Sequence, residues 1–404
     1  MKEGLSATNT TAHFTLPKHI SELDGLRAIA VLAVMCTHTA LRFRVVHLDK
    51  VFQYGWTGVD LFFVLSGFLI TGILIDSRSS RSYFQNFYAR RILRIWPIYF
   101  LLVSTAFAIF PLIVSRDPYL LQHLPHESRS AWVYFAFLQN LIHCGQPTQL
   151  LLGVTWSLAI EEQFYLAWPL LVRFSSRRAL TAIMLTILAV SPPVRWGAMT
   201  VFHLPPGWIY DNTITRLDGL AVGALLAIVL HSGRYSREVL RNCSLALLSA
   251  GALGAFLLVP PRISDHAAPL AFTSLALACG GAVGFSLSMV GRKTLLNRAL
   301  NCPPLQYIGR ISYCLYLVYL SVFAILNSSV FRRKAFFGET SSGDLHVILV
   351  GFAGSILCAT LSWYLLEAPI LKFKRFFVDR EDVKLSKVSP VILSGSRLPE
   401  KVEG

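Results

Sequence analysis

The chain has 404 residues, of which 54% are hydrophobic and only 15% are charged. Soluble domains are roughly 45–50% apolar and about 25% charged, so a soluble fold of this composition would lack the polar side chains to cover its surface. The net charge of +15 would suggest a nucleic-acid partner in a soluble protein, but basic cytosolic loops account for it in a membrane protein. Composition therefore indicates an integral membrane protein that does not bind nucleic acid.

Long apolar runs follow one another along most of the chain. A helix needs roughly 20 apolar residues to cross a hydrocarbon core about 30 Å thick. The pattern predicts an all-α polytopic membrane protein with about ten transmembrane helices, near residues 23–41, 57–75, 95–114, 155–172, 179–192, 217–231, 242–259, 268–290, 307–327 and 345–366. The fifth span is short because Pro192 and Pro193 follow it. Residues 131–142 are apolar but too few to cross, so a re-entrant or interfacial helix is expected there.

The basic residues are unevenly divided between the predicted loops. If the amino terminus is cytosolic, the inner segments hold 25 Lys and Arg and the outer segments hold ten. Cytosolic loops of membrane proteins carry the excess of basic residues, so both termini are predicted to be cytosolic. The expected organisation is a cytosolic segment over 1–22, a membrane domain over 23–376 and a polar, disordered tail over 377–404. The seven cysteines form no CxxC pair, so neither a disulfide framework nor a metal site is predicted.

Arg27 and His38 lie at opposite ends of the first span. Charges inside a membrane helix are costly and usually face a partner or a water-filled cavity. Eleven residues make about three helical turns and rise ~16 Å, so both side chains are expected on one face at different depths. A structural alternative, in which each side chain reaches the nearer membrane surface, remains open.

Arg91 and Arg94 stand three residues apart at the inner end of the third span, just before Trp96. This spacing places two guanidinium groups on one helical face, which suits phosphate oxygens. Arginines beside a tryptophan also anchor many spans at the membrane surface, and that alternative stays open as well.

Acidic residues form a second group. Asp60 lies early in the second span, and Glu161 and Glu162 lie about two turns into the fourth. Both spans are predicted to run inward from the outer side, so these acids approach the depth of His38. Adjacent helical positions differ by about 100°, so one of the two glutamates is expected to face the interior. Asp218 is expected to neutralise Arg216, two residues before it, unless it lies on the acceptor side.

Both groups fit a single chemical interpretation. A cationic inner mouth would hold a phosphorylated donor, and His38 would take a proton from an acceptor hydroxyl nearer the outer face. A carboxylate from Asp60, Glu161 or Glu162 would fix the imidazole tautomer and stabilise the imidazolium.

These residues stand in recognisable motifs, and the sequence resembles the membrane acyltransferase-3 family over nearly the whole membrane region. The motifs are Leu23-Asp24-Gly25-Leu26-Arg27-Ala28-Ile29-Ala30 followed by His38, then Gly58-Val59-Asp60-Leu61-Phe62-Phe63, Arg91-Ile92-Leu93-Arg94-Ile95-Trp96-Pro97 and Thr155-Trp156-Ser157 through Pro169. Weaker similarities are Arg216-Leu217-Asp218-Gly219-Leu220, Ile311-Ser312-Tyr313-Cys314-Leu315-Tyr316-Leu317 and Ser362-Trp363-Tyr364-Leu365-Leu366-Glu367-Ala368-Pro369.

The resemblance implies an O-acyltransferase of the bacterial cytoplasmic (inner) membrane. Its co-substrate would be a cytosolic acyl-CoA such as acetyl-CoA, with no bound cofactor, and its acceptor a sugar or glycan hydroxyl on the far side. Arg27 and His38, and the pair Arg91 and Arg94, match the family pattern. Whether His38 acts as a general base or carries the acyl group covalently stays open. Trp156, Asp218 and Tyr313 are the acceptor-side candidates. Where the family often has a His in the ninth span, this chain has Tyr319.

Two other functions compete with this one. A secondary transporter would also place acids and a His inside the membrane. A non-catalytic subunit that binds lipid or polysaccharide would use the arginine pair for an anionic lipid.

Overall fold

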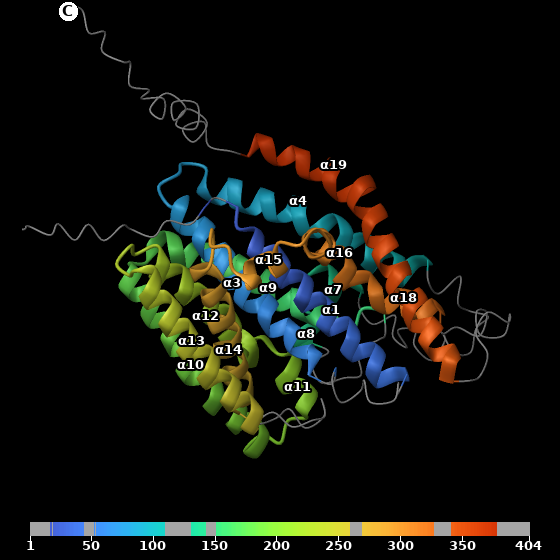
Figure 1. Cartoon of the computed structure of the whole chain (residues 1–404), viewed down its shortest axis with the longest axis horizontal. Helices are drawn as coiled ribbons and strands as arrows, with labels where there is room; N and C mark the ends of the chain where they lie inside the picture. Colours follow the sequence, from blue (N-terminus) through green and yellow to red (C-terminus); the bar gives the residue numbers. More distant parts are fainter. Residues whose placement is uncertain are drawn as a thin grey trace, which may run out of the picture.

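A computed structural model describes residues 17, 19–43, 52, 54–109, 131–142, 151–258, 269–326 and 341–377. All regular structure in these residues is helical, as Figure 1 shows. The all-α class is therefore confirmed. The tail over 378–404 and the loop over 115–130 lie outside the described residues.

Eight helical segments in the described part of the chain are long and apolar enough to cross a membrane. They contain α3 (Gly58–Asp76), α4 (Tyr83–Ser104), α10 (Arg177–Thr200), α12 (Thr213–Leu230), α13 (Arg237–Leu258), α14 (Ala271–Ser288), α16 (Pro303–Leu326) and α18 (Ser341–Ser362). Two more helices of spanning length, α1 (Ser21–Phe43) and α9 (Thr155–Phe174), are not among the eight. Both carry acidic and basic side chains, which lower their hydropathy, so the count of ten remains a prediction.

Two predicted boundaries are wrong. The third span was predicted to begin at residue 95, but α4 begins at Tyr83 because its first half is an amphipathic extension with Arg90, Arg91 and Arg94 on it. The fifth was predicted to end before Pro192 and Pro193, but α10 continues through both prolines to Thr200. Prolines inside membrane helices are tolerated where neighbouring groups satisfy the freed backbone.

Residues 131–142 form two short helices, α7 (Ala131–Phe135) and α8 (Gln139–Ile142), with Phe137 between them at a φ of 55°. Side-chain amides fasten α8 to the bundle: the Asn140 amide donates to the Thr213 hydroxyl at 2.7 Å, and the Gln163 amide donates to Asn140 at 2.8 Å. The segment is thus tied to α9 and α12.

The helices pack into one bundle around α3 and α12 (Figure 1). These two helices approach closely because each has a glycine at the contact: a Cβ at Gly67 would collide with the Leu220 carbonyl, and one at Gly223 with the Val64 carbonyl. Small residues at helix contacts are typical of membrane bundles. On one side α1 packs against α16, which packs against α18, and on the other α13 packs against α14.

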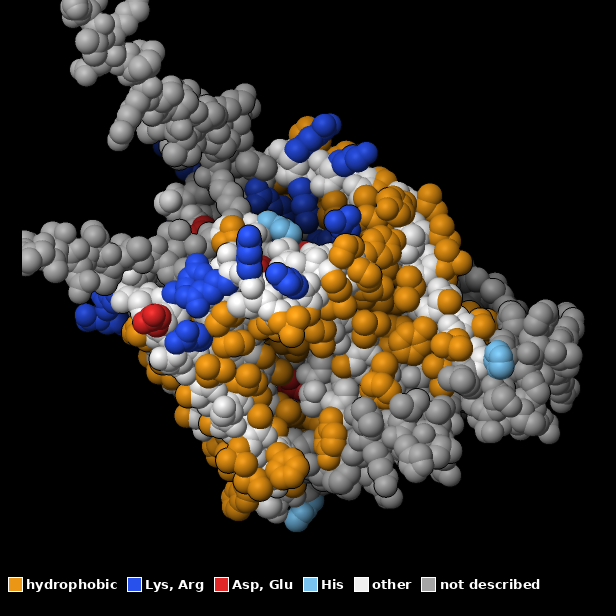
Figure 2. Space-filling model, in the orientation of Figure 1, with side chains coloured by type: hydrophobic (Ala, Val, Ile, Leu, Met, Phe, Trp, Pro, Cys, Tyr) orange, Lys and Arg blue, Asp and Glu red, His pale blue; other side chains and the backbone are white. Residues whose placement is uncertain are grey.

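Charge and hydrophobicity separate along the bundle. Figure 2 shows most Lys and Arg side chains on this face gathered at one end, with apolar side chains over the surface below them. Phe256 on α13, for example, is 84% exposed.

At the basic end, the imidazole of His231 lies 3.2 Å from Asp76. The hydrogen bond to that carboxylate raises the pKa of His231, so the ion pair persists to a higher pH than an isolated His would allow.

Short elements complete the structure. They are η1 (Gly55–Thr57), η2 (Thr105–Ile109), α11 (Pro206–Asp211), α15 (Leu295–Leu300), η4 (Trp363–Glu367), α19 (Ala368–Leu371) and η5 (Lys372–Phe376).

Candidate active site

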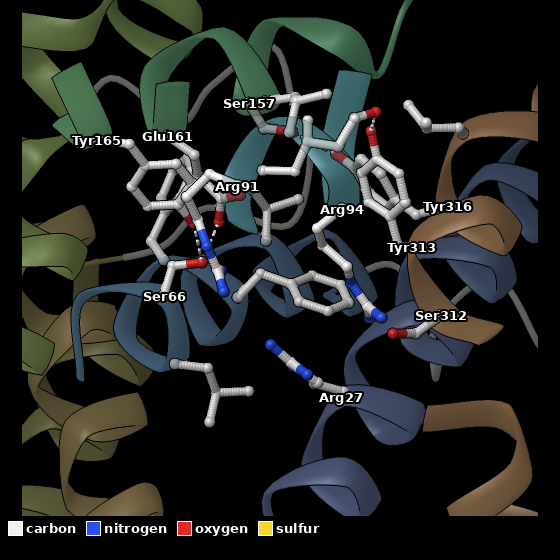
Figure 3. A pocket seen from close by; sticks show the side chains of 17 residues that line it. Arg27, Ser66, Arg91, Arg94, Ser157, Glu161, Tyr165, Ser312, Tyr313 and Tyr316 are labelled. Carbon is white, nitrogen blue, oxygen red and sulfur yellow. Dashed lines mark hydrogen bonds between the residues drawn. The ribbon is translucent and has the colours of Figure 1, made fainter. Parts of the chain in front are cut away.

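A cavity lies where α1, α3, α4, α9 and α16 meet. Figure 3 labels the polar side chains among the residues that line it. They are Arg27, Ser66, Arg91, Arg94, Ser157, Glu161, Tyr165, Ser312, Tyr313 and Tyr316. All three arginines singled out in the sequence belong to this set.

Arg27, Arg91 and Arg94 bring three guanidinium groups to the cavity from two helices, α1 and α4. Arg27 has one carboxylate nearby, that of Asp24, at 3.7 Å. Neither Arg91 nor Arg94 has a hydrogen bond or an ion pair within 4.0 Å to any residue that the structure describes. Half-buried cations without a close partner are costly, so this arrangement fits an anionic ligand in the cavity.

Glu161 faces the same cavity. Its Oε1 accepts a hydrogen bond from the Ser66 hydroxyl at 2.5 Å, and that hydroxyl accepts one from Tyr165 at 2.9 Å (Figure 3). Glu162 instead accepts from the Trp96 indole at 3.2 Å and does not line the cavity. One glutamate of the pair therefore points into the cavity, as helical geometry requires.

The depth of Glu161 differs from the expectation that the acids share a layer with His38. Ser66, its partner, lies six residues beyond Asp60 on α3, which is ~9 Å further along the helix axis. Glu161 consequently shares a compartment with the arginines.

His38 lies outside this set of lining residues. Its Nδ1 is 2.9 Å from the Val34 carbonyl oxygen and 3.0 Å from the Tyr319 hydroxyl. A carbonyl only accepts hydrogen bonds, so Nδ1 carries the proton and the lone pair of the neutral imidazole is on Nε2. In the described part of the chain no carboxylate contacts the ring. The tautomer of His38 is therefore fixed by the Val34 carbonyl and not, as the sequence had predicted, by a carboxylate.

Three tyrosines on α16 connect the cavity with His38. Tyr313 and Tyr316 line the cavity, and Tyr319 reaches the imidazole. The Tyr316 hydroxyl is 2.8 Å from the Ser157 Oγ, and its ring lies 5.8 Å from that of Phe62 and 6.3 Å from that of Tyr319. Their spacing of three residues places them on one side of the helix, and this spacing can be read from the sequence alone.

Asp60 does not line the cavity. Its Oδ1 lies 3.1 Å from the Arg216 guanidinium, and both side chains are buried. The guanidinium also lies 4.1 Å from the ring centroid of Phe272 and 5.2 Å from that of Tyr210, distances at which cation–π attraction is substantial. These contacts make Asp60 the counter-charge of a buried arginine.

The expected pair of Asp218 with Arg216 is wrong. Residues two apart on a helix do not face each other, so Arg216 turns toward α3 and Asp218 toward α10. There Asp218 accepts from Arg195 at 3.0 Å. Arg195 also donates to the Thr215 carbonyl at 2.6 Å and to the Thr273 hydroxyl at 2.5 Å, so it is almost fully hydrogen-bonded inside the bundle.

The three acceptor-side candidates do not come together. Tyr313 lines the arginine cavity and donates its hydroxyl to the Ile95 carbonyl at 2.7 Å. Trp156 is buried against Phe63 and Tyr210, and Asp218 is only 1% exposed. Trp156 and Asp218 therefore stabilise the bundle in this structure.

The fold and the site together define a membrane protein of many helices with a basic cavity. The family described as "Acyltransferase domain" matches residues 20–367, so the chain belongs to this family and the resemblance noted in the sequence is confirmed. No solved structure matches the chain.

Three similar proteins come from bacteria. The chain is 28% identical over 393 residues to the O-acetyltransferase OatA of Staphylococcus aureus (strain MRSA252), covering 93% of this chain and 62% of that protein. It is 28% identical to the peptidoglycan O-acetyltransferase OatA of Listeria monocytogenes, with 88% and 56% covered. It is 30% identical to the putative peptidoglycan O-acetyltransferase YrhL of Bacillus subtilis, with 87% and 55% covered. The chain therefore covers between 55% and 62% of the length of these three relatives.

Proposed function

We propose that this chain is an O-acetyltransferase that moves an acetyl group from cytosolic acetyl-CoA to a glycan hydroxyl on the other side of the bacterial cytoplasmic membrane. The observation that carries the proposal is the convergence of Arg27, Arg91 and Arg94 on one cavity, with no close ion-pair partner for Arg91 or Arg94 in the described residues. Guanidinium groups bind phosphate oxygens through paired hydrogen bonds, and coenzyme A carries phosphates at one end and the reactive thioester at the other.

The donor lies with its phosphates against the arginines and its acyl arm directed past Tyr316 toward His38. An extended arm suits the ~16 Å along α1 between Arg27 and His38. Relatives named as peptidoglycan O-acetyltransferases support a cell-wall glycan as the acceptor.

In the reaction, Nε2 of His38 takes the proton of the acceptor hydroxyl as its oxygen attacks the thioester carbonyl carbon. The carbon–sulfur bond breaks, the ester forms, and the departing thiolate of coenzyme A receives the proton from the imidazolium. Nδ1 keeps its hydrogen bond to the Val34 carbonyl, which holds the ring in place throughout.

The test uses the protein reconstituted in liposomes with radiolabelled acetyl-CoA and peptidoglycan fragments. We expect His38→Ala to abolish transfer and to leave coenzyme A binding unchanged, because His38 lies outside the arginine cavity. Cys36→Ala, on the same helix, is the matched control and should retain full activity. Normal transfer by His38→Ala would contradict the proposal.

A carrier function receives less support. The buried acids Asp60 and Asp218 already have arginine partners, so they are not free to bind a transported ion. Solute uptake into the same liposomes without any consumption of thioester would nevertheless favour a carrier over a transferase.

A further inference from the structure

A further cation approaches Arg27, Arg91 and Arg94 from the C-terminal end of the last helical segment. The end of this segment, η5, contains Lys372, Lys374 and Arg375. Lys374 is half-buried, whereas Lys372 and Arg375 are exposed. The Arg90 Nε donates to the Phe377 carbonyl at 2.8 Å, and this bond fixes the end of η5 beside α4. Of these three basic residues, Lys374 is the one turned toward the bundle.

The surroundings of Lys374 are strongly cationic. Its segment, η5, packs against α4, the helix that carries Arg90, Arg91 and Arg94, and these arginines together with Arg27 are the cations that interact with it. No carboxylate lies within 4.0 Å of its ammonium group, and it has no hydrogen bond, among the residues that the structure describes. Like charges repel strongly when partly removed from water, so a half-buried ammonium group on a segment packed against the arginine-bearing helix fits a site for an anion with several charges.

The positions of Lys374 and of the three α4 arginines relative to the cavity indicate which part of such an anion each one contacts. Arg91 and Arg94 line the cavity, whereas Arg90 and Lys374 do not. From Arg90 to Arg94 the helix rises ~6 Å toward its outer end, and Arg90 holds the end of η5. Lys374 therefore joins the cluster on the side away from His38, where the donor's nucleotide end would lie.

We propose that Lys374 binds the 3′-phosphate of the acyl-CoA donor, next to the arginines that bind its diphosphate. This inference rests on the proposed function. Two guanidinium forks on one helical face suit the adjacent oxygens of a diphosphate, and a compact ammonium group suits a single phosphate as a point charge. Lys374 also lies beyond residue 367, where the match to the family ends.

The test compares two probes that differ only in this phosphate, coenzyme A and 3′-dephospho-coenzyme A. Binding of each is measured by calorimetry to the full chain in phosphatidylcholine liposomes. We expect Lys374→Gln to weaken coenzyme A binding about tenfold and dephospho-coenzyme A binding less than twofold. Lys374→Arg should retain most of the difference between the probes. Lys372→Gln, two residues away and exposed, is the matched control and should change neither affinity.

Each other outcome has a definite meaning. Equal weakening of both probes by Lys374→Gln, or of neither, overturns the role in 3′-phosphate recognition while leaving the donor site intact. Absence of coenzyme A binding by the unmodified protein overturns the donor proposal itself. If Lys374→Gln leaves coenzyme A affinity unchanged but lowers the retention of cardiolipin in mixed liposomes, the cation binds a lipid phosphate and the inference is wrong.

Discussion

Two groups of arginines lie inside this bundle, and they differ in what surrounds them. Arg195 and Arg216 are fully buried, and each has a carboxylate at 3.0 or 3.1 Å. Arg91 and Arg94 are half-buried, line a cavity and have no such partner in the described residues. A cation whose partner is built into the protein stabilises the fold, whereas a cation that faces an open cavity without one is available to a ligand.

The largest effect is expected at the paired group. Asp218→Asn leaves Arg195 buried without its counter-charge, which typically costs about 3–5 kcal/mol. We expect a large fall in the melting temperature of the purified protein, followed by intrinsic fluorescence. The double variant Arg195→Met with Asp218→Leu should recover part of the loss, because no unpaired charge remains. A melting temperature unchanged by Asp218→Asn would show that this pair is not structural.

The unpaired group should behave in the opposite way. Arg91→Gln or Arg94→Gln removes charge-assisted hydrogen bonds worth ~1.5–3 kcal/mol each, so each should weaken coenzyme A binding roughly 10- to 100-fold. The melting temperature without ligand should stay the same or rise, since mutual repulsion falls. Arg81→Gln, an exposed arginine just before α4, is the control. Unchanged donor affinity in both variants would place the phosphate site elsewhere.

The smallest effect is expected at Tyr319, which belongs to neither group of arginines and contacts His38. Tyr319→Phe removes the hydroxyl beside His38 but leaves the Nδ1 bond to Val34, so the tautomer is kept. The loss of about 0.5–1.5 kcal/mol should lower the rate of transfer roughly 2- to 12-fold with unchanged donor affinity. Tyr307→Phe on the same helix, which loses a 2.8 Å hydrogen bond to Thr360, is the control. Complete loss of transfer in Tyr319→Phe would indicate that the tyrosine itself takes part in the chemistry.

The sequence predicted most of the long helices, and it singled out three arginines that prove to line one cavity, for a physical reason. Apolar length and helical periodicity are local properties, so α3 and α9 begin within one residue of their predicted starts. Arg27, Arg91 and Arg94 carry charges where charges are costly, and this alone marked them as residues that face an interior space.

The sequence could not predict which side chains contact each other between different helices. Asp218 was assigned to the nearest basic residue in the chain, but its partner is Arg195 on another helix. Tyr319 was noted only as a departure from the family pattern, although it contacts His38. The amphipathic first half of α4 was missed because hydropathy detects the apolar part of a helix and not its polar continuation.

The rings of Phe62, Tyr316, Tyr319 and His38 follow one another at centroid distances of 5.7 to 6.3 Å. If the acetyl group crosses the bilayer as we propose, its route must not let protons and ions leak down their gradients. The rings bring apolar surface to the route that we propose for the acyl arm, and apolar surface disfavours a continuous file of water.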